Sequence, residues 1–104
     1  MRKIYYVYII KCSDHSYYTG ITNNVYKRIE EHNIGIDRYS YTYSRRPVEL
    51  LFYHDFLNVE DAIIFEKKIK GWSRAKKEAL IEGRYDDLPK LSTNHNKDSS
   101  TSSE

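Results

Sequence analysis

Two runs of β-branched and aromatic residues constrain the fold of this chain more than any other feature of its sequence. Residues 4–11 and 17–21 are rich in tyrosine and isoleucine, residue types that favour β-strands. Between the two runs lies Ser-Asp-His-Ser, a cluster of turn-forming residues. Two short strand patterns separated by such a cluster predict a β-hairpin at the start of the chain.

The rest of the chain adds one strand and three helices. The predicted elements are a helix that Asn23 or Asn24 caps and Gly35 ends, a strand over residues 48–55, a helix over residues 59–71, and a helix over residues 73–81 that stops at Gly83. Residues 36–47 lack a clear period and end in Arg-Arg-Pro, which predicts an exposed basic loop. The order β-β-α-β-α-α predicts an α+β fold, with a three-stranded antiparallel sheet flanked by helices.

Length and composition limit the class of protein. The 104 residues suffice for one domain, predicted over residues 1–83, and the polar composition of residues 84–104 predicts a disordered tail. The single cysteine, Cys12, excludes an internal disulfide, favours a reducing compartment and is expected to be buried. Since no apolar run approaches the length of a membrane span, we expect a cytoplasmic protein without a membrane partner. The net charge of +2 leaves other partners open.

The second predicted helix carries a carboxylate among apolar residues. Its apolar face consists of Val59, Ala62, Ile63, Phe65 and Ile69, and Glu66 projects among them. Because an unpaired buried charge is costly, this site must offer a metal ion, a cationic side chain or a raised pKa. A purely structural ion pair, or a helix rotated to expose Glu66, would also fit the pattern.

The first predicted helix places a guanidinium beside an imidazole. Arg28 and His32 are four residues apart and share one edge of the apolar stripe. Arginine can bind phosphate oxygens with a planar fork, and a neutral histidine can hydrogen-bond a hydroxyl or a water near pH 7. The alternatives are a solvated surface arginine and a structural core histidine.

The chain contains eleven tyrosines, several of them in the predicted hairpin. Side-chain alternation puts Tyr6 and Tyr8 on one face of the first strand and Tyr5 on the other, while Tyr18 lies in the paired strand. Such a phenol can be a core aromatic, a hydrogen-bond donor to phosphate, or a general base if cationic neighbours lower its pKa from about 10.

Cations interleaved with aromatic residues predict a surface for nucleic acid. Arg45 and Arg46 lie in the predicted loop, and Lys70 and Arg74 lie where the second and third helices meet. Lysine and arginine neutralise phosphates, and neighbouring aromatic rings can stack on bases. A solvated charged surface with no ligand is the alternative.

Taken in order, these motifs resemble the GIY-YIG endonuclease superfamily. The motifs are Tyr6-Val7-Tyr8, Tyr18-Thr19-Gly20, Arg28 with His32, and Glu66, and the similarity covers about residues 4–82. The segments Tyr-Thr-x-x-Arg-Arg-Pro-Val-Glu-Leu and Phe-Glu-x-x-Ile-Lys-x-x-Ser-Arg look like the small standalone bacterial branch, which is similar to the nuclease domain of excinuclease ABC and to Slx-type nucleases. The sequence departs from the founding pattern at Tyr6, which replaces a glycine, and at Thr19, which replaces an isoleucine.

The resemblance implies hydrolysis of phosphodiester bonds in DNA by one divalent metal ion, in DNA repair or processing. It implies that Glu66 holds Mg²⁺ or Mn²⁺, that Tyr8 is the general base, and that Arg28 stabilises charge on the phosphate. His32 and Tyr18 would orient the water, the base or the phosphate. No small-molecule cofactor is expected, and the protein is expected to be a monomer or a weak dimer.

Two other functions remain open at this point. A non-catalytic module could bind nucleic acid on the same scaffold, and a protein-interaction domain would bind no nucleic acid at all. A domain of this size has little surface for reading a base sequence, so we expect recognition of DNA structure or backbone.

Overall fold

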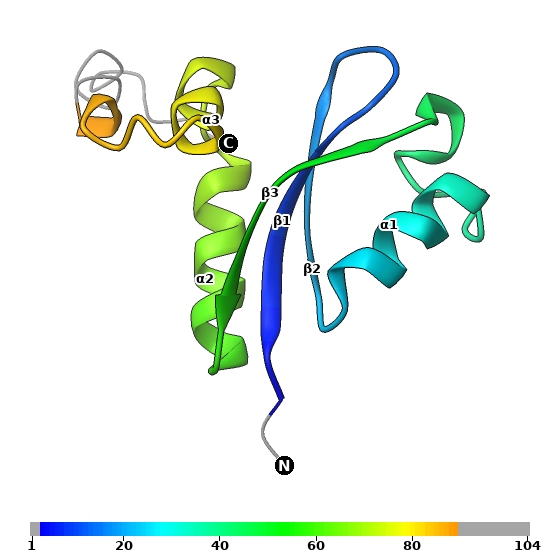
Figure 1. Ribbon diagram of the computed structural model, residues 1–104, viewed down its shortest axis with the longest axis horizontal. Helices are drawn as coiled ribbons and strands as arrows, with labels where there is room; N and C mark the ends of the chain where they lie inside the picture. Colours follow the sequence, from blue (N-terminus) through cyan, green and yellow to red (C-terminus); the bar gives the residue numbers. More distant parts are fainter. Residues whose placement is uncertain (1–2, 90–104) are drawn as a thin grey trace. The chain divides into compact units, whose positions relative to one another are not determined.

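The computed structural model describes residues 3–89 (Figure 1). These residues form two compact units, residues 3–66 and residues 67–89. The first unit contains the sheet and the first helix, together with most of the second helix. No helix in the described part of the chain combines the length and the apolar character that crossing a membrane requires.

The first unit is built on the predicted antiparallel sheet. Its strands are β1 (Tyr5–Lys11), β2 (Tyr17–Thr22) and β3 (Glu49–Phe56), in the order β2-β1-β3. The central strand β1 pairs antiparallel with both neighbours, so that Tyr8 lies between Gly20 and Tyr53. The predicted α+β fold and the order β-β-α-β-α-α are therefore confirmed, with an added 3₁₀ turn, η1 (Tyr43–Arg45).

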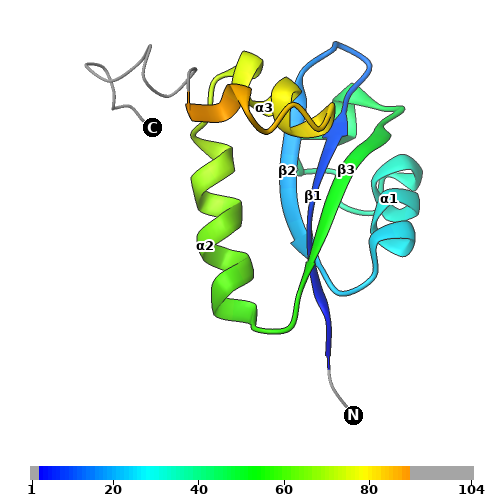
Figure 2. The same cartoon turned by 60° about the vertical axis from the view of Figure 1, so that its left-hand side comes forward.

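One face of the sheet packs against helix α1 (Val25–Ile34). Tyr8, Ile10, Cys12 and Val48 form a buried cluster there, and Ile29 of α1 packs on it. Figure 2 shows α1 alongside β3. The Asn24 side chain caps the helix by accepting a hydrogen bond from the Lys27 N–H at 3.1 Å, and Gly35 closes it in the left-handed conformation. Both predicted helix ends, and the burial of Cys12, are confirmed.

Helix α2 (Val59–Lys70) uses the other face of the sheet. Its Phe65 ring lies 5.3 Å from the ring of Phe56, whose strand partner is Tyr5. Ala62 is fully buried and Glu66 is 8% exposed, so the row of residues four apart from Ala62 to Glu66 is the inward row. The prediction that Val59 and Ile63 belong to the buried face is wrong, because each is 38% exposed.

The segment between α1 and β3 is an organised loop in which the two arginines make internal contacts. The Arg45 guanidinium lies 3.8 Å from the centre of the Tyr41 ring and donates to Asp14 at 3.1 Å. Arg46 stacks on Tyr43 and donates to the Ile34 carbonyl at 3.1 Å, which satisfies an unpaired group at the end of α1. The predicted exposed basic loop is therefore wrong, because aromatic rings and carbonyl groups half-bury both arginines.

The second unit contains the end of α2 and helix α3 (Arg74–Ile81). Ser73 caps α3, and Ala79 and Leu80 are its buried residues. Arg84 forms ion pairs with Glu82 and Asp87. The predicted polar tail begins at this arginine, and its residues 90–104 lie outside the described part of the chain.

Candidate functional site

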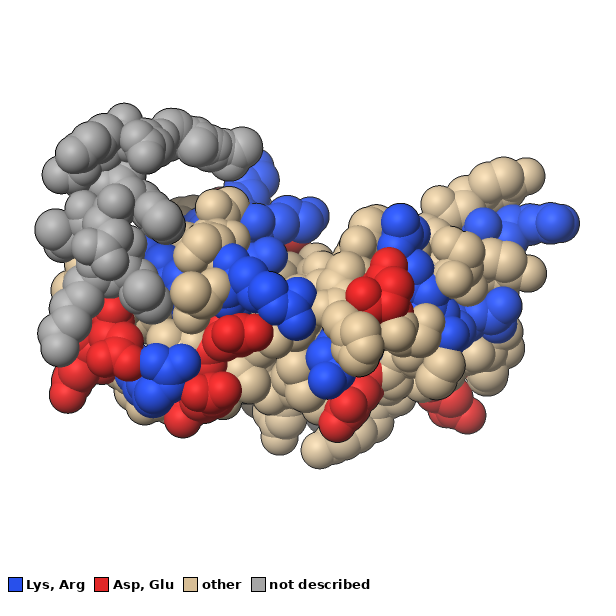
Figure 3. All heavy atoms as spheres, turned by 90° about the horizontal axis from the view of Figure 1, so that it is seen from above, with Lys and Arg blue, Asp and Glu red and all other residues tan. Residues whose placement is uncertain are grey.

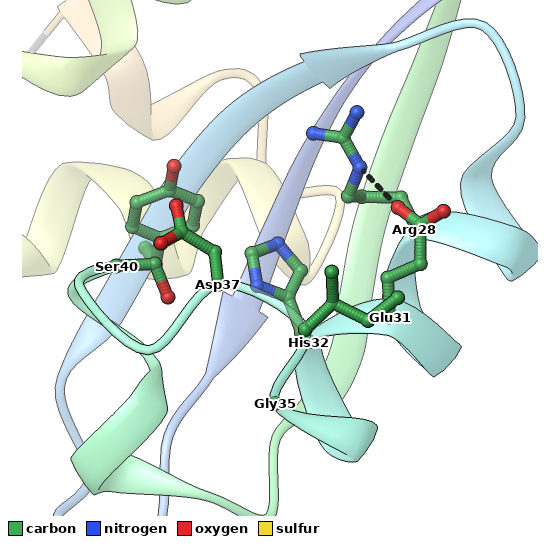
Figure 4. Close-up of a pocket in the computed structure, with 8 residues that line it drawn as sticks. Arg28, Glu31, His32, Gly35, Asp37 and Ser40 are labelled. Atoms are coloured by element: carbon green, nitrogen blue, oxygen red, sulfur yellow. Dashed lines mark hydrogen bonds and ion pairs between the residues drawn. The ribbon is translucent and has the colours of Figure 1, made fainter.

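A cleft of about 300 Å³ opens beside the side of α1 that carries Arg28 and His32. We call it the histidine cleft; it is lined by Tyr18, Arg28, Glu31, His32, Gly35, Ile36, Asp37 and Ser40. Figure 4 shows Arg28, Glu31 and His32 on one helix, with Asp37 and Ser40 on the loop that follows it. The structure thus brings together three of the predicted catalytic residues, Tyr18, Arg28 and His32.

A chain of hydrogen bonds runs from the sheet through His32 into the loop. The Tyr8 hydroxyl lies 2.9 Å from His32 Nε2, and His32 Nδ1 lies 2.7 Å from the hydroxyl of Thr42, which is fully buried. The Thr42 hydroxyl in turn lies 3.1 Å from the Ser40 hydroxyl at the cleft. Tyr8, the fourth predicted catalytic residue, therefore reaches the site through its contact with His32.

The protonation of this chain follows from burial. Burial raises the pKa of Tyr8 to about 12, with a further contribution from Tyr18, although Arg28 opposes the shift. Burial, followed by the Arg28 charge, lowers the pKa of His32. Near neutral pH the phenol therefore keeps its proton and donates it to Nε2 of a neutral imidazole, which leaves Nδ1–H to donate to Thr42. The expectation that positive charge lowers the pKa of Tyr8 is wrong, because the phenol is 1% exposed and burial outweighs Arg28.

Gly20 is the residue that lets Tyr8 take this position. A Cβ atom on Gly20 would lie 2.5 Å from the Tyr8 hydroxyl oxygen and 2.7 Å from the ring carbon that bears it. Any side chain larger than hydrogen would therefore push the phenol away from its place across β2. This contact gives the glycine of the Tyr18-Thr19-Gly20 motif a physical reason.

Tyr18 is held by stacking. Its ring lies 6.0 Å from the Tyr41 ring at an interplanar angle of 17°, and 5.5 Å from the His32 ring at 69°. Since Arg45 lies over Tyr41, the guanidinium and the two tyrosines support the wall of the histidine cleft. This arrangement shows Arg45 in a supporting position, and its predicted contact with nucleic acid stays a prediction.

The histidine cleft also contains two carboxylates that the sequence patterns did not reveal. Arg28 Nε donates to the Glu31 carboxylate at 3.1 Å, and Asp37 lines the opposite part of the cleft. The Arg28 and Glu31 side chains are 42% and 32% exposed, so their ion pair is a weak one that a phosphate can compete with. The spacing of three residues on a helix could have indicated the Glu31 contact.

Glu66 is placed apart from these residues. The residues that line the histidine cleft come from β2, from α1 and from the loop after it, and α2 contributes none of those identified in the described chain. The neighbouring Phe65 packs on the face of the sheet opposite Tyr8. The described residues hold no group of three or more His, Cys, Asp or Glu side chains suited to a metal. A role for Glu66 as the metal ligand stays a prediction.

The predicted nucleic-acid contacts lie among charges of both signs. Arg45 pairs with Asp14 and Arg74 pairs with Glu78, both at 3.1 Å, and both pairs are partly exposed. Figure 3 shows lysine and arginine side chains interspersed with aspartate and glutamate on the face it displays. Contacts of Arg45, Arg46, Lys70 and Arg74 with nucleic acid therefore stay a prediction.

A three-stranded sheet that carries a tyrosine, an arginine and a histidine beside one cleft defines a class of small α+β catalytic domain. The chain belongs to the GIY-YIG family, a family of nucleases, because the profile of the GIY-YIG catalytic domain matches residues 4–79. Among curated relatives, a UPF0213 protein of Staphylococcus haemolyticus is 46% identical over 80 residues, which cover 77% of this chain and 96% of that protein. A UPF0213 protein of Halobacterium salinarum is 47% identical over 78 residues, covering 75% of this chain and all of that protein.

Solved structures agree with this assignment. The solution NMR structure of a protein from E. faecalis aligns with a TM-score of 0.56 and 31% identity, over 82% of this chain and 92% of that one. The solution NMR structure of a UPF0213 protein from Bacillus halodurans aligns with a TM-score of 0.50 and 40% identity, over 76% of this chain and 83% of that one. The chain is therefore similar to small standalone proteins along nearly their whole length.

Proposed function

We propose that this protein is a divalent-metal-dependent endonuclease that hydrolyses phosphodiester bonds in DNA, in DNA repair or processing in the cytoplasm. The observation that carries the proposal is the histidine cleft, where an arginine lies beside a histidine that is hydrogen-bonded to a buried tyrosine. Membership of the GIY-YIG family supports the same reaction. The near-neutral charge of the chain favours recognition of DNA backbone or structure over recognition of a base sequence.

Arg28 is the group that binds the scissile phosphate in this proposal. Its guanidinium lines the cleft and is partly exposed, so it can exchange the Glu31 carboxylate for phosphate oxygens. Arginine suits this task because its planar fork donates two parallel hydrogen bonds to an oxyanion. The same contact would stabilise the negative charge that builds up on the phosphate during hydrolysis.

Tyr8 and His32 act as a pair that takes a proton from the attacking water. Alone, a phenol with a pKa of about 12 is protonated near pH 7 and cannot act as a base. In the pair, the phenol oxygen accepts the proton of the water while the phenol proton passes to His32 Nε2, 2.9 Å away. Thr42 holds the imidazole in the tautomer that leaves Nε2 free to accept. Tyr18 positions the imidazole through its edge-to-face contact.

Glu66 is the residue proposed to hold one Mg²⁺ or Mn²⁺ ion. The donor chemistry fits, because a hard cation of this kind binds to one or two carboxylates and completes its coordination with water and phosphate oxygens. When bound, such a metal would supply charge stabilisation at the phosphate. The Glu66 side chain is buried and takes part in interactions within the described chain, so metal binding would replace or extend those contacts.

The test is a cleavage assay with labelled single-stranded, duplex and flap DNA, in Mg²⁺, in Mn²⁺ and in EDTA. We expect cleavage only with the metal, and we expect Glu66→Gln to abolish cleavage while DNA binding is retained. Glu30→Gln, on an exposed position of α1, is the matched control and should behave like the original protein. Binding without cleavage of every substrate would instead indicate a non-catalytic nucleic-acid-binding module.

A further inference from the structure

A second cleft, of about 310 Å³, opens at the start of α1. We call it the tyrosine cleft; it is lined by Tyr6, Asn23, Asn24, Val25, Tyr26 and Tyr53. Tyr53 is the strand partner of Tyr8, and Tyr6 is two residues before Tyr8, so the tyrosine cleft lies on the same face of the sheet as the catalytic pair. The proposed reaction assigns no task to any of these six residues.

Three tyrosine rings in the tyrosine cleft support one another and remain open to solvent. The Tyr53 ring meets the Tyr6 ring edge-on, with centroids 5.7 Å apart, and meets the Tyr26 ring edge-on at 6.5 Å. Tyr26 is 70% exposed and Tyr53 is 45% exposed, so ring surface is available to a ligand. Edge-to-face contact fixes the orientation of each ring, which lowers the entropy that binding must overcome.

The chemistry of the lining favours a nucleobase over a phosphate. None of the six residues identified in the described chain as lining the tyrosine cleft carries a positive or a negative charge. Two of them are asparagines, whose amide group can offer a donor and an acceptor side by side to the edge of a base. The Asn24 oxygen accepts from the Lys27 N–H, which leaves its amide hydrogens as donors. A flat, uncharged ring system with polar edges matches both the rings and the amides.

The position on α1 relates the two clefts to each other. Tyr26 comes two residues before Arg28 and six before His32, which is about 3 Å and about 9 Å along the helix axis. A strand of DNA whose phosphate lies at Arg28 can therefore bring a neighbouring nucleotide to the tyrosine cleft.

We propose that the tyrosine cleft binds an unpaired nucleobase, by stacking on Tyr26 and Tyr53, of a nucleotide next to the phosphate that is cut. This inference rests on the proposed nuclease function and narrows its substrate to DNA with unstacked bases. A base inside a duplex has both faces covered by its neighbours, whereas a base in a single strand, a flap or a frayed end has a face free for an aromatic side chain. Tyr6, which replaces the glycine of the founding pattern, supports the ring of Tyr53.

The experiment measures binding and needs no cleavage. A fluorescently labelled single-stranded oligodeoxythymidylate is titrated with the protein in EDTA, and fluorescence anisotropy gives Kd. A strand of equal length made wholly of abasic residues provides the same phosphates without bases. We expect Tyr26→Ala to raise Kd for the base-bearing strand about 5- to 100-fold and to leave Kd for the abasic strand unchanged. Because Tyr26 is exposed, its truncation should leave the fold intact, and circular dichroism checks this.

Tyr85→Ala is the matched control, because Tyr85 is a tyrosine that is 59% exposed and belongs to the second unit. Three results overturn the inference: no binding of either strand, an equal loss on both strands, or no effect of Tyr26→Ala. If the original protein cuts DNA and Tyr26→Ala leaves Kd unchanged, the nuclease function stands and the base-binding cleft fails. If base-dependent binding is found without any cleavage, the nuclease function fails and the cleft stands.

Discussion

Tyr8 and Tyr53 are the same residue type, face each other on neighbouring strands and lie on the same face of the sheet, yet their environments differ completely. Tyr8 is 1% exposed and hydrogen-bonded to His32, whereas Tyr53 is 45% exposed and makes only edge-on ring contacts with Tyr6 and Tyr26 among the aromatic contacts of the described chain. Burial raises the pKa of Tyr8 to about 12 and aims its proton at an imidazole. Residue type therefore does not decide which tyrosine does chemistry; burial and the hydrogen-bond partner do.

Changing each of these two tyrosines in turn should separate chemistry from binding. Tyr8→Phe keeps the ring and deletes the hydroxyl that contacts His32, so we expect kcat for DNA cleavage to fall by about 10²- to 10⁴-fold. Tyr53→Ala deletes a stacking ring, so its effect should fall on KM. Steady-state cleavage of labelled single-stranded DNA measures both constants, and Tyr85→Phe and Tyr85→Ala provide the matched controls. An equal effect of both variants on kcat would contradict the division of tasks.

The close approach of Gly20 to Tyr8 allows a test that involves no titratable group. Gly20→Ala places a methyl group within 2.5 Å of the Tyr8 oxygen, so we expect the free energy of unfolding to fall by about 1–3 kcal/mol. Urea denaturation followed by circular dichroism gives this value. In a Tyr8→Ala background the same substitution should cost little, because the clashing ring is absent. Additive costs in the double variant would show that Gly20 acts through something other than Tyr8.

Thr42 should matter for stability and for the pH profile together. Thr42→Val keeps the shape of the side chain and leaves the buried Nδ1–H of His32 without an acceptor, which should cost about 1–3 kcal/mol. Thr42→Ser keeps the hydroxyl and should restore most of the catalytic rate, whereas Thr42→Val should shift the acidic limb of the kcat profile. If Thr42→Ser and Thr42→Val lose the same activity, the hydroxyl has no positioning role.

The lowered pKa of His32 predicts how stability depends on pH. Because His32 is held neutral in the fold, the unfolded chain binds its proton more readily, and the free energy of unfolding should rise with pH up to the ordinary histidine value of about 6.5. Above that pH the His32 contribution should be constant. Urea denaturation at several pH values from 5 to 8 measures the slope, and His32→Gln should reduce it. His54→Gln, at an exposed histidine, is the control and should leave the slope unchanged.

Local sequence signals were enough to predict the elements and part of the site. Asn24 and Gly35 mark the ends of α1, and the four-residue spacing of Arg28 and His32 placed them side by side, as the structure confirms. The hydrogen bond to Thr42 could not be predicted, because it depends on how a loop of irregular sequence returns to α1. The direction of the Tyr8 pKa shift was also missed, since burial depends on packing across three strands and a helix.

Glu31 offers the smallest effect and the sharpest contrast between the two clefts. In the histidine cleft its carboxylate occupies the Arg28 guanidinium at 3.1 Å, whereas the tyrosine cleft has no such competitor among its described lining residues. Glu31→Gln removes that negative charge, so Arg28 is released for phosphate and Kd for single-stranded DNA should fall a few-fold. The gain should be small because an exposed ion pair contributes only about 0.2–1 kcal/mol. Anisotropy in EDTA measures it, and the gain should shrink at high salt and apply equally to the abasic strand, since a phosphate contact carries no information about bases. A gain confined to the base-bearing strand would mean that Glu31 acts on the tyrosine cleft, and would remove the separation between phosphate binding and base binding on which the comparison rests.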